Sequence, residues 1–197
     1  MPNLYIIAGC NGAGKTTASL TILPEILGCK EFVNADNIAA GLSPFNVESV
    51  AVEAGRIMLH RIEELLQLQT DFAIETTLAT RSYAGLVKKA QAQGYKVSLI
   101  YIWLNSAELA MQRVAERVSN GGHNIPVAVI RRRYTKGVKN LFELFMPVCD
   151  TWIIADNSYG DLVPVARKET EFDNVIENDD LWHLINKQFY ESTARKC

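Results

Sequence analysis

Cysteine is scarce in this sequence, and no two of the four residues have C-x-x-C spacing: Cys10, Cys29, Cys149 and Cys197. This scatter excludes a zinc site built on paired cysteines and indicates no disulfide framework. Isolated thiols are typical of a reducing compartment, so a cytoplasmic location is expected.

Long apolar runs are also missing. No stretch reaches the ~18 residues that crossing a bilayer requires. Ile7-Ala8-Gly9-Cys10 resembles a lipoprotein cleavage site, but no basic residue precedes it and the apolar run is too short for a signal peptide. No membrane partner is expected.

Neither sign of charge is in large excess. The chain has 20 Lys and Arg against 22 Asp and Glu, a net charge of −2, which removes any whole-protein electrostatic case for nucleic-acid binding. Charge gathers locally instead. Residues 113–139 hold seven basic side chains against the single acid Glu116, and residues 169–180 hold six acids and no base. The first segment is a candidate anion site, and the second a solvated connection to the last helix.

Short apolar runs alternate with segments of helical spacing along the whole chain. This order predicts an α/β fold in one domain, residues 1–197, with a five-stranded parallel sheet and helices on both faces. The predicted strands are 4–8, 31–35, 72–76, 96–104 and 151–155, and the predicted helices are 15–27, 47–69, 82–93, 106–118, 127–145 and 181–193.

Residues 9–16 read Gly-Cys-Asn-Gly-Ala-Gly-Lys-Thr and satisfy G-x-x-x-x-G-K-[ST] directly after the first predicted strand. In this pattern main-chain N–H groups surround a polyphosphate at the positive end of a helix. Lys15 is expected to reach the β- and γ-phosphates of ATP, and the Thr16 hydroxyl to ligate Mg²⁺. The motif indicates the three-layer P-loop NTPase or kinase fold, strand order 2-3-1-4-5. The predicted ATP-binding residues are Gly9, Asn11, Gly12, Ala13, Gly14, Lys15, Thr16 and Thr17.

Motifs of other P-loop classes are absent. A GTPase should contain N-K-x-D, but Asn186-Lys187-Gln188-Phe189 lacks the aspartate, and the L-S-G-G-Q signature of transport ATPases does not occur. A compact chain with a basic, glycine-containing segment late in the sequence is typical of small-molecule kinases. We therefore predict transfer of the γ-phosphoryl group to a small-molecule hydroxyl. An acceptor-independent ATPase or nucleotide switch and a nucleic-acid 5′-kinase are the alternatives, and the overall acidity argues against the latter.

Carboxylates and hydroxyls follow the strands at the edge where parallel α/β sheets bind ligands. Asp36 is placed to accept the proton of an attacking hydroxyl. Glu75 and Thr77 are candidates to hold neighbouring hydroxyls of the substrate, and Glu75 is alternatively a candidate to assist Mg²⁺ through water. A capping role for Asp36 and an ion-paired or capping role for Glu75 are the competing interpretations.

The basic segment is expected to form a mobile lid over residues 117–134. Arginines on a closed lid stabilise the charge that phosphoryl transfer leaves on oxygens. Three consecutive arginines cannot all face the site, because helical neighbours differ by about 100°. Arg117 and Arg132 are the catalytic candidates, and Asn157, after the fifth strand, is a candidate nucleotide contact. The predicted lid residues are Arg113, Arg117, His123, Arg131, Arg132 and Arg133.

Together these motifs resemble the zeta toxin family of P-loop kinases from Leu4 to about Ser158. The resemblance rests on residues 9–16, Asn34-Ala35-Asp36, Glu75-Thr76-Thr77 and Gly121-Gly122-His123-x-Ile125-Pro126-x-x-x-Ile130-Arg131-Arg132-Arg133-Tyr134. The last stretch, with Asn140-Leu141 and Asp156-Asn157-Ser158, is similar to a zeta-like subgroup common in Gram-negative bacteria.

The resemblance implies a fold like that of shikimate and adenylate kinases, and the use of ATP and Mg²⁺. It implies Asp36 as general base, Glu75 and Thr77 as acceptor contacts and lid arginines as transition-state stabilisers. It also implies a nucleotide sugar, UDP-N-acetylglucosamine, as the acceptor, and a separate antitoxin protein as a partner.

Overall fold

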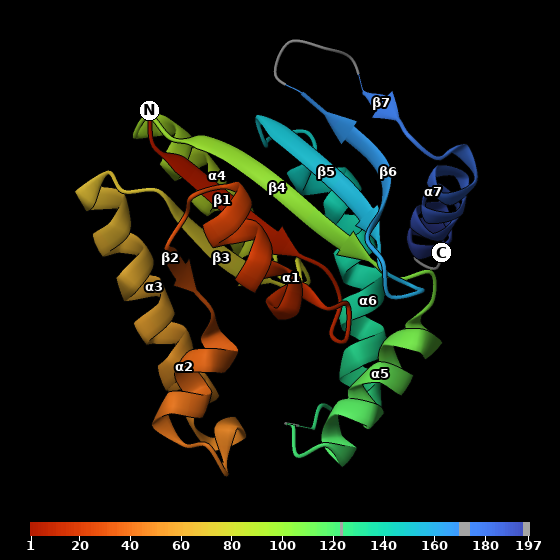
Figure 1. The fold of residues 1–197 in the computed structure, drawn as a ribbon, viewed down its shortest axis with the longest axis horizontal. Coiled ribbons are helices and arrows are strands. Elements are labelled where there is room, and N and C mark those ends of the chain that lie inside the picture. Colours follow the sequence, from red (N-terminus) through yellow and green to blue (C-terminus); the bar gives the residue numbers. More distant parts are fainter. Residues whose placement is uncertain (123, 170–173, 195–197) are drawn as a thin grey trace.

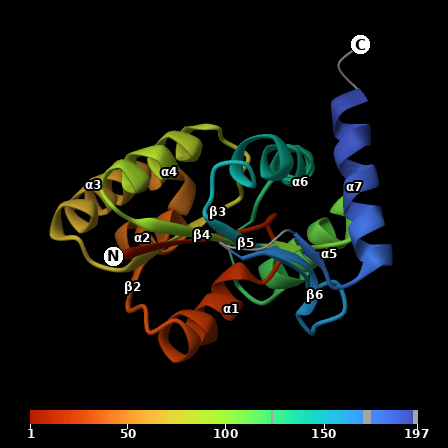
Figure 2. The same ribbon diagram turned by 90° about the horizontal axis from the view of Figure 1, so that it is seen from above.

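The computed structural model describes residues 1–122, 124–169 and 174–194. Over these residues the strands form a seven-stranded sheet in the order β2-β3-β1-β4-β5-β6-β7. In Figure 2, α3, α4 and α6 lie on one side of the sheet and α1 on the other, which gives three layers. The strands are β1 (Asn3–Ala8), β2 (Glu31–Val33), β3 (Phe72–Thr76), β4 (Lys96–Trp103), β5 (Thr151–Asp156), β6 (Val163–Lys168) and β7 (Val175–Ile176).

The first five strands pair in parallel and confirm the predicted fold class and the order 2-3-1-4-5. The central strands are runs of Ile, Leu, Val and aromatic residues because helices cover both of their faces. The two added strands, β6 and β7, are antiparallel and were not predicted. Pro164 at the start of β6 and the two-residue length of β7 leave little strand signal in the sequence.

The helices follow the predicted alternation, with changes at their ends (Figure 1). The predicted helix 15–27 ends at Thr21 and continues as a π-helical turn, where Leu27 N donates to Ile22 O at 3.0 Å. Pro24 has no N–H to give to the usual acceptor four residues back, which accounts for the wider turn. The helices are α1 (Lys15–Thr21), α2 (Ala35–Leu42), α3 (Ala51–Leu68), α4 (Ser82–Ala92), α5 (Ala107–Ser119), α6 (Val127–Asn140) and α7 (Asp179–Ala194), with short turns at Ile22–Ile26, Val47–Val50 and Leu141–Phe145.

The structure differs most from the predicted elements in the segment after β2. The strand was expected to reach Ala35, but it ends at Val33, and α2 occupies residues for which no helix was predicted. Asn34 is the N-cap of this helix: its side-chain oxygen accepts from Asp36 N at 2.8 Å and from Asn37 N at 3.3 Å. Asp36 therefore stands in the first turn of a helix.

The core lies between the sheet and its covering helices. Its largest buried side chains include Phe72, Tyr101, Trp103, Phe145 and Trp152. None of the described helices is both long enough and apolar enough to cross a membrane.

Candidate active site

The loop between β1 and α1 takes a shape that only glycine tolerates at several positions. Gly9, Gly12 and Gly14 have φ of 145°, 79° and 85°. A Cβ on Gly9 would lie 2.1 Å from the carbonyl oxygen of Ile102, and one on Gly14 would lie 2.6 Å from Asn157 Nδ2. The glycines therefore keep the loop against β4 and the end of β5. Apart from those of Gly9 and Ala13, the N–H groups of the loop donate to no main-chain oxygen of the described residues, and they stand at the start of α1.

The substitution Gly9→Ala is expected to destabilise the fold by about 2–4 kcal/mol, because the clash is with main-chain oxygen that cannot rotate away. Urea denaturation monitored by circular dichroism measures this change. Gly85→Ala is the matched control: Gly85 lies in α4, has no positive φ, and its added Cβ meets nothing within 4 Å. An equal effect of the two substitutions would contradict the prediction.

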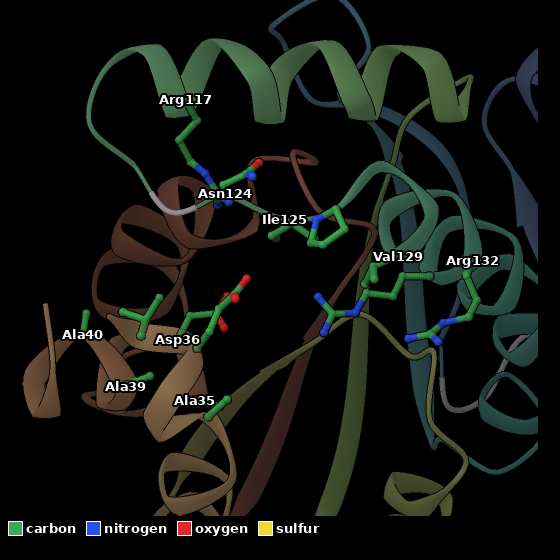
Figure 3. Close-up of a pocket in the computed structure, with 14 residues that line it drawn as sticks. Ala35, Asp36, Ala39, Ala40, Arg117, Asn124, Ile125, Val129 and Arg132 are labelled. Carbon is green, nitrogen blue, oxygen red and sulfur yellow. The ribbon is translucent and has the colours of Figure 1, made fainter. Parts of the chain in front are cut away.

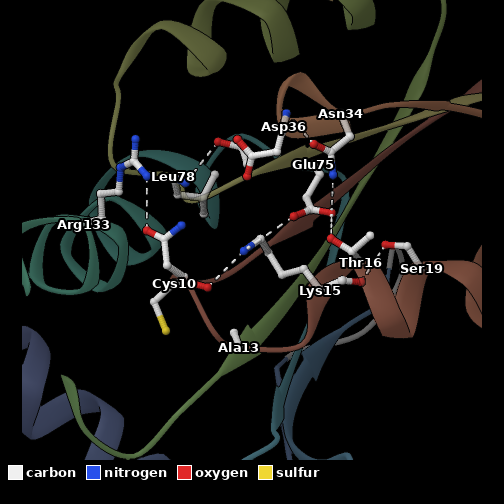
Figure 4. A network of polar contacts seen from close by, with 12 residues as sticks. Cys10, Ala13, Lys15, Thr16, Ser19, Asn34, Asp36, Glu75, Leu78 and Arg133 are labelled. Carbon is white, nitrogen blue, oxygen red and sulfur yellow. Dashed lines mark hydrogen bonds and ion pairs between the residues drawn. The ribbon is translucent and has the colours of Figure 1, made fainter. Parts of the chain in front are cut away.

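A buried polar network joins the loop to β3 and β2 (Figure 4). Lys15 is 7% exposed; its Nζ donates to the Cys10 carbonyl oxygen at 2.9 Å and lies 3.7 Å from Glu75 Oε1. The other carboxylate oxygen of Glu75 accepts hydrogen bonds from Thr16 Oγ1 and Asn34 Nδ2, each at 2.8 Å. Three side chains, two from the P-loop motif and one from the end of β2, thus converge on one carboxylate of β3.

The pair formed by the Thr16 hydroxyl and the Glu75 carboxylate suits a magnesium ion. Both are hard oxygen donors, and Mg²⁺ prefers a few such protein ligands while retaining water and substrate phosphates. No group of three or more His, Cys, Asp or Glu side chains able to hold a metal occurs among the described residues. The donor set therefore fits a metal brought in with a nucleotide, rather than a cage supplied by protein alone.

The arginines of the basic segment have different partners and surroundings. Arg133 Nη1 donates to Asn11 Oδ1 of the P-loop at 3.2 Å, which joins α6 to the loop. Arg131 pairs instead with Glu108 on α5 at 3.2 Å, and both side chains are mostly exposed. Arg113 Nη2 donates to the Ser158 carbonyl oxygen at 3.0 Å. Arg117 and Arg132 line the cavity described next, whereas His123 lies outside the described residues.

A cavity of about 480 Å³ opens between α2 and the α5–α6 segment. Figure 3 shows Ala35, Asp36 and neighbouring alanines on one wall, with the Asp36 carboxylate directed into the space. The facing wall carries Arg117, Asn124, Ile125, Val129 and Arg132.

A second cavity, of about 580 Å³, contains Lys15, Glu75 and Thr77 and shares Asp36 and Arg132 with the first. The shared residues make the two cavities parts of one cleft. Asp36 stands where they meet, between the P-loop side and the α5–α6 side.

Several side chains of this second cavity were missed from the sequence. Its outer wall includes Arg56, Val52 and Leu59 of α3, with Tyr83 of α4 and Lys136 of α6. These residues lie on three separate helices in no shared motif, so only the tertiary fold reveals them. The cavity has five cationic side chains, Lys15, Arg56, Arg132, Arg133 and Lys136, against two acidic ones, Asp36 and Glu75.

The turn after β5 also contacts the P-loop. Asn157 Nδ2 donates to the Ala13 carbonyl oxygen at 2.9 Å. Asp156 is buried, and its carboxylate accepts from the Ser158 main-chain N–H and hydroxyl. Asp156 therefore shapes the turn that carries Asn157. Thr17, in the first turn of α1, is exposed.

Cys10 lies within the P-loop but is not a reactive thiol. Its side chain is buried, and burial raises the pKa of the thiol to about 11. The neutral form therefore predominates at physiological pH, and the thiol acts as a small packing group beneath the loop.

The fold and this site define the chain as a protein of the P-loop kinase class. The family model for zeta toxin matches residues 1–158. The chain belongs to the zeta toxin family, as its motifs predicted. An uncharacterised protein of Haemophilus influenzae is 29% identical over 126 residues, which cover 64% of this chain and 88% of that protein.

Solved structures agree on the fold. The AvrRxo1-ORF1:ORF2 complex with ATP has a TM-score of 0.76 at 19% identity; the match covers 94% of this chain, which spans only 63% of that one. The PezAT chromosomal toxin–antitoxin system of Streptococcus pneumoniae has a TM-score of 0.64 at 17% identity, covering 98% and 88% of the two chains. A gluconokinase of Sinorhizobium meliloti has a TM-score of 0.50 at 13% identity, covering 98% and 92%.

Proposed function

We propose that this protein is a phosphotransferase that moves the γ-phosphoryl group of ATP, with Mg²⁺, to a hydroxyl of a small molecule. The observation that carries the proposal is the cleft in which Lys15 of the P-loop and the Asp36 carboxylate face one cavity system. The similarity to a complex that contains ATP supports the choice of nucleotide.

In the proposed reaction the oxygen of the acceptor hydroxyl attacks the γ-phosphorus, while Asp36 accepts the proton of that hydroxyl. The bond between the γ-phosphorus and the bridging oxygen breaks, and ADP leaves. Thr16 would hold Mg²⁺ directly and Glu75 through water, and the metal would neutralise charge on the β- and γ-phosphates. Lys15 supplies a fixed positive charge at the outer phosphates.

The α5–α6 segment completes the proposed site. Arg117 and Arg132 face the cavity that holds Asp36 and are placed to stabilise charge on the transferred phosphoryl oxygens. Arg133 donates a hydrogen bond to Asn11 of the P-loop. The turn that carries Asn157 also contacts the P-loop, and we propose that the nucleoside of ATP lies beside this turn. We propose that residues 117–134 act as the lid of the reaction.

The acceptor proposed is a small molecule that carries an anionic group. The described residues show no salt bridge involving Arg56, Arg132 or Lys136, so these cations are not neutralised within the cavity. Val52 and Leu59 of the same wall are 71% and 60% exposed and could cover an apolar ring. A nucleotide sugar combines both features, and UDP-N-acetylglucosamine is the leading candidate, as the family resemblance implies.

The central experiment incubates the purified protein with γ-labelled ATP and either UDP-N-acetylglucosamine or a cell metabolite extract, followed by mass identification of the labelled ester. Labelled product and acceptor-dependent ADP release are expected. Steady ADP release in buffer alone would instead favour an ATPase or nucleotide switch. Labelling of oligonucleotide ends, with a steep salt dependence, would favour a nucleic-acid 5′-kinase.

The double substitution Arg56→Ala with Lys136→Ala is expected to raise KM for an anionic acceptor about 10-fold or more, because two exposed cations that meet the acceptor are lost. KM for ATP should change little, since neither residue touches the P-loop network. Steady-state kinetics at varied acceptor concentration measures both constants. Lys88→Ala, an exposed cation of α4 outside the cavity, is the control. An unchanged acceptor KM would contradict the anionic-acceptor assignment.

A cytoplasmic toxin role with an antitoxin partner is the biological setting we propose. It is supported by family membership and by the toxin–antitoxin system among the similar structures. Growth arrest on expression of the chain, relieved by a protein that binds it, would test this role.

A further inference from the structure

The C-terminal helix α7 lies beyond the residues that the zeta toxin model matches, yet it packs against α6 of the site. An aromatic cluster holds it in place. Trp182 stacks with Trp152 of β5 at a ring-centroid distance of 6.4 Å, and Phe189 stacks with Phe142 at 4.8 Å. Helix α7 is therefore a fixed neighbour of α6.

One polar side chain of α7 reaches into the space between β4 and α6. Gln188 Nε2 donates to the Asn105 carbonyl oxygen at 2.6 Å, and Gln188 Oε1 accepts from Trp103 Nε1 at 3.1 Å. The hydroxyl of Tyr134, on α6, lies 2.8 Å from the same Oε1. A single side chain thus joins the end of β4 to the middle of α6.

The chemistry of the partners fixes the orientation of the Gln188 amide. An indole N–H can only donate and a main-chain carbonyl can only accept, so Oε1 must face Trp103 and Nε2 must face Asn105. The Tyr134 hydroxyl has one proton and two acceptors in reach, Gln188 Oε1 and, at 2.6 Å, the Leu104 carbonyl oxygen. Burial raises the pKa of Tyr134, which keeps this donor protonated.

The anchored tyrosine follows the two site arginines directly in α6. Arg132 lines both cavities, and Arg133 donates to Asn11 of the P-loop. Tyr134 itself is 7% exposed and Trp103 is 1% exposed, whereas Gln188 is half-buried, so the link is partly sheltered from water. A shift of α6 that breaks this link would displace both guanidinium groups relative to the P-loop.

We infer that Gln188 is a positioning residue for phosphoryl transfer: it holds α6 in the register that presents Arg132 and Arg133 to the cleft. The inference rests on the proposed function. Helix α7 lies outside residues 1–158, which the family model matches. The inference gives this helix a role in the reaction that no motif of the sequence indicates.

The test replaces Gln188 by methionine, which keeps the length and shape of the side chain but removes its hydrogen bonds. The kcat for acceptor-dependent ADP formation should fall at least about 10-fold, because small misplacements of catalytic groups reduce rates steeply. The Kd for ATP from calorimetry should stay within about 3-fold of the parent, since the loop amides and Lys15 are untouched. Lys187→Ala, an exposed neighbour on α7, should match the parent.

Hydrogen exchange of the amides of residues 127–140 gives a readout that does not depend on activity. It should accelerate in Gln188→Met while that of residues 15–21 is unchanged. If Gln188→Met does not fold, Tyr134→Phe removes the hydroxyl that lies between Gln188 and the Leu104 carbonyl oxygen, and it should show the same direction of change. A folded variant with parental kcat, or with parental exchange in α6, would overturn the inference. A parent protein without any kinase activity would contradict the proposed function instead, and the exchange experiment would still decide whether Gln188 holds α6 in place.

Discussion

Replacing Lys15 by methionine is expected to lower the rate of phosphoryl transfer by about 10²–10³-fold and to weaken ATP binding strongly. The substitution keeps the aliphatic stem but removes the charge that lies 3.7 Å from Glu75 and beside the P-loop carbonyl of Cys10. Loss of one fixed charge at the transferred group typically costs about 10²–10³ in rate. Calorimetric titration with Mg²⁺ and ATP, together with ADP formation, measures both effects.

Two comparisons separate the loss of charge from loss of structure. Lys30→Met removes an exposed lysine remote from the loop and should behave like the parent. The Lys15 variant leaves the buried Glu75 carboxylate without its cation, so some loss of stability is expected and thermal unfolding must be recorded. Parental ATP affinity in a folded Lys15→Met protein would disprove the P-loop interpretation on which the enzyme assignment depends.

Asp36→Asn is expected to lower acceptor-dependent ADP formation by about 10²–10⁴-fold, because the amide cannot take the hydroxyl proton. ATP binding should be retained, since the Asp36 side chain forms no hydrogen bond or ion pair with the P-loop network, and the main-chain N–H that Asp36 donates to Asn34 is unchanged. The kcat at saturating ATP and acceptor gives the size of the effect.

Glu53→Gln is the matched control for this charge change, because Glu53 is exposed on α3 and lines neither cavity. Full turnover by Asp36→Asn would remove the general-base assignment while leaving the nucleotide site intact. Equal loss of ATP affinity and turnover would point to a structural role of Asp36 in α2.

The parallel core could be predicted because its signals are local. Each central strand is a short apolar run buried on both faces, and the motif at residues 9–16 fixes which strand precedes the phosphate loop. Positions at or shortly beyond the ends of predicted strands also sufficed to predict that Asp36, Glu75 and Thr77 lie at one edge of the sheet. The side chains of all three line the second cavity.

What could not be predicted depends on tertiary contacts. Helix α2 has an Asn-, Asp- and Gly-containing sequence that reads as a loop, and it is stabilised by the Asn34 cap and by packing on α3. Strand β6 forms by antiparallel pairing with the edge of β5 that no parallel strand occupies, and this pairing is a tertiary contact. Arg56 and Lys136 belong to helices that are far apart in sequence, so their shared cavity has no sequence pattern.

The carboxylate of Glu75 connects the two halves of the proposed reaction. One of its oxygens is shared by the Thr16 hydroxyl, the proposed ligand of the metal, and by the Asn34 amide, whose oxygen caps the helix that carries Asp36. Any rearrangement of Glu75 that accompanies metal binding must therefore reach the first turn of α2 through two hydrogen bonds. In the proposed reaction, loading of the nucleotide and alignment of Asp36 as the base are therefore expected to be coupled, without any direct contact between Asp36 and the P-loop.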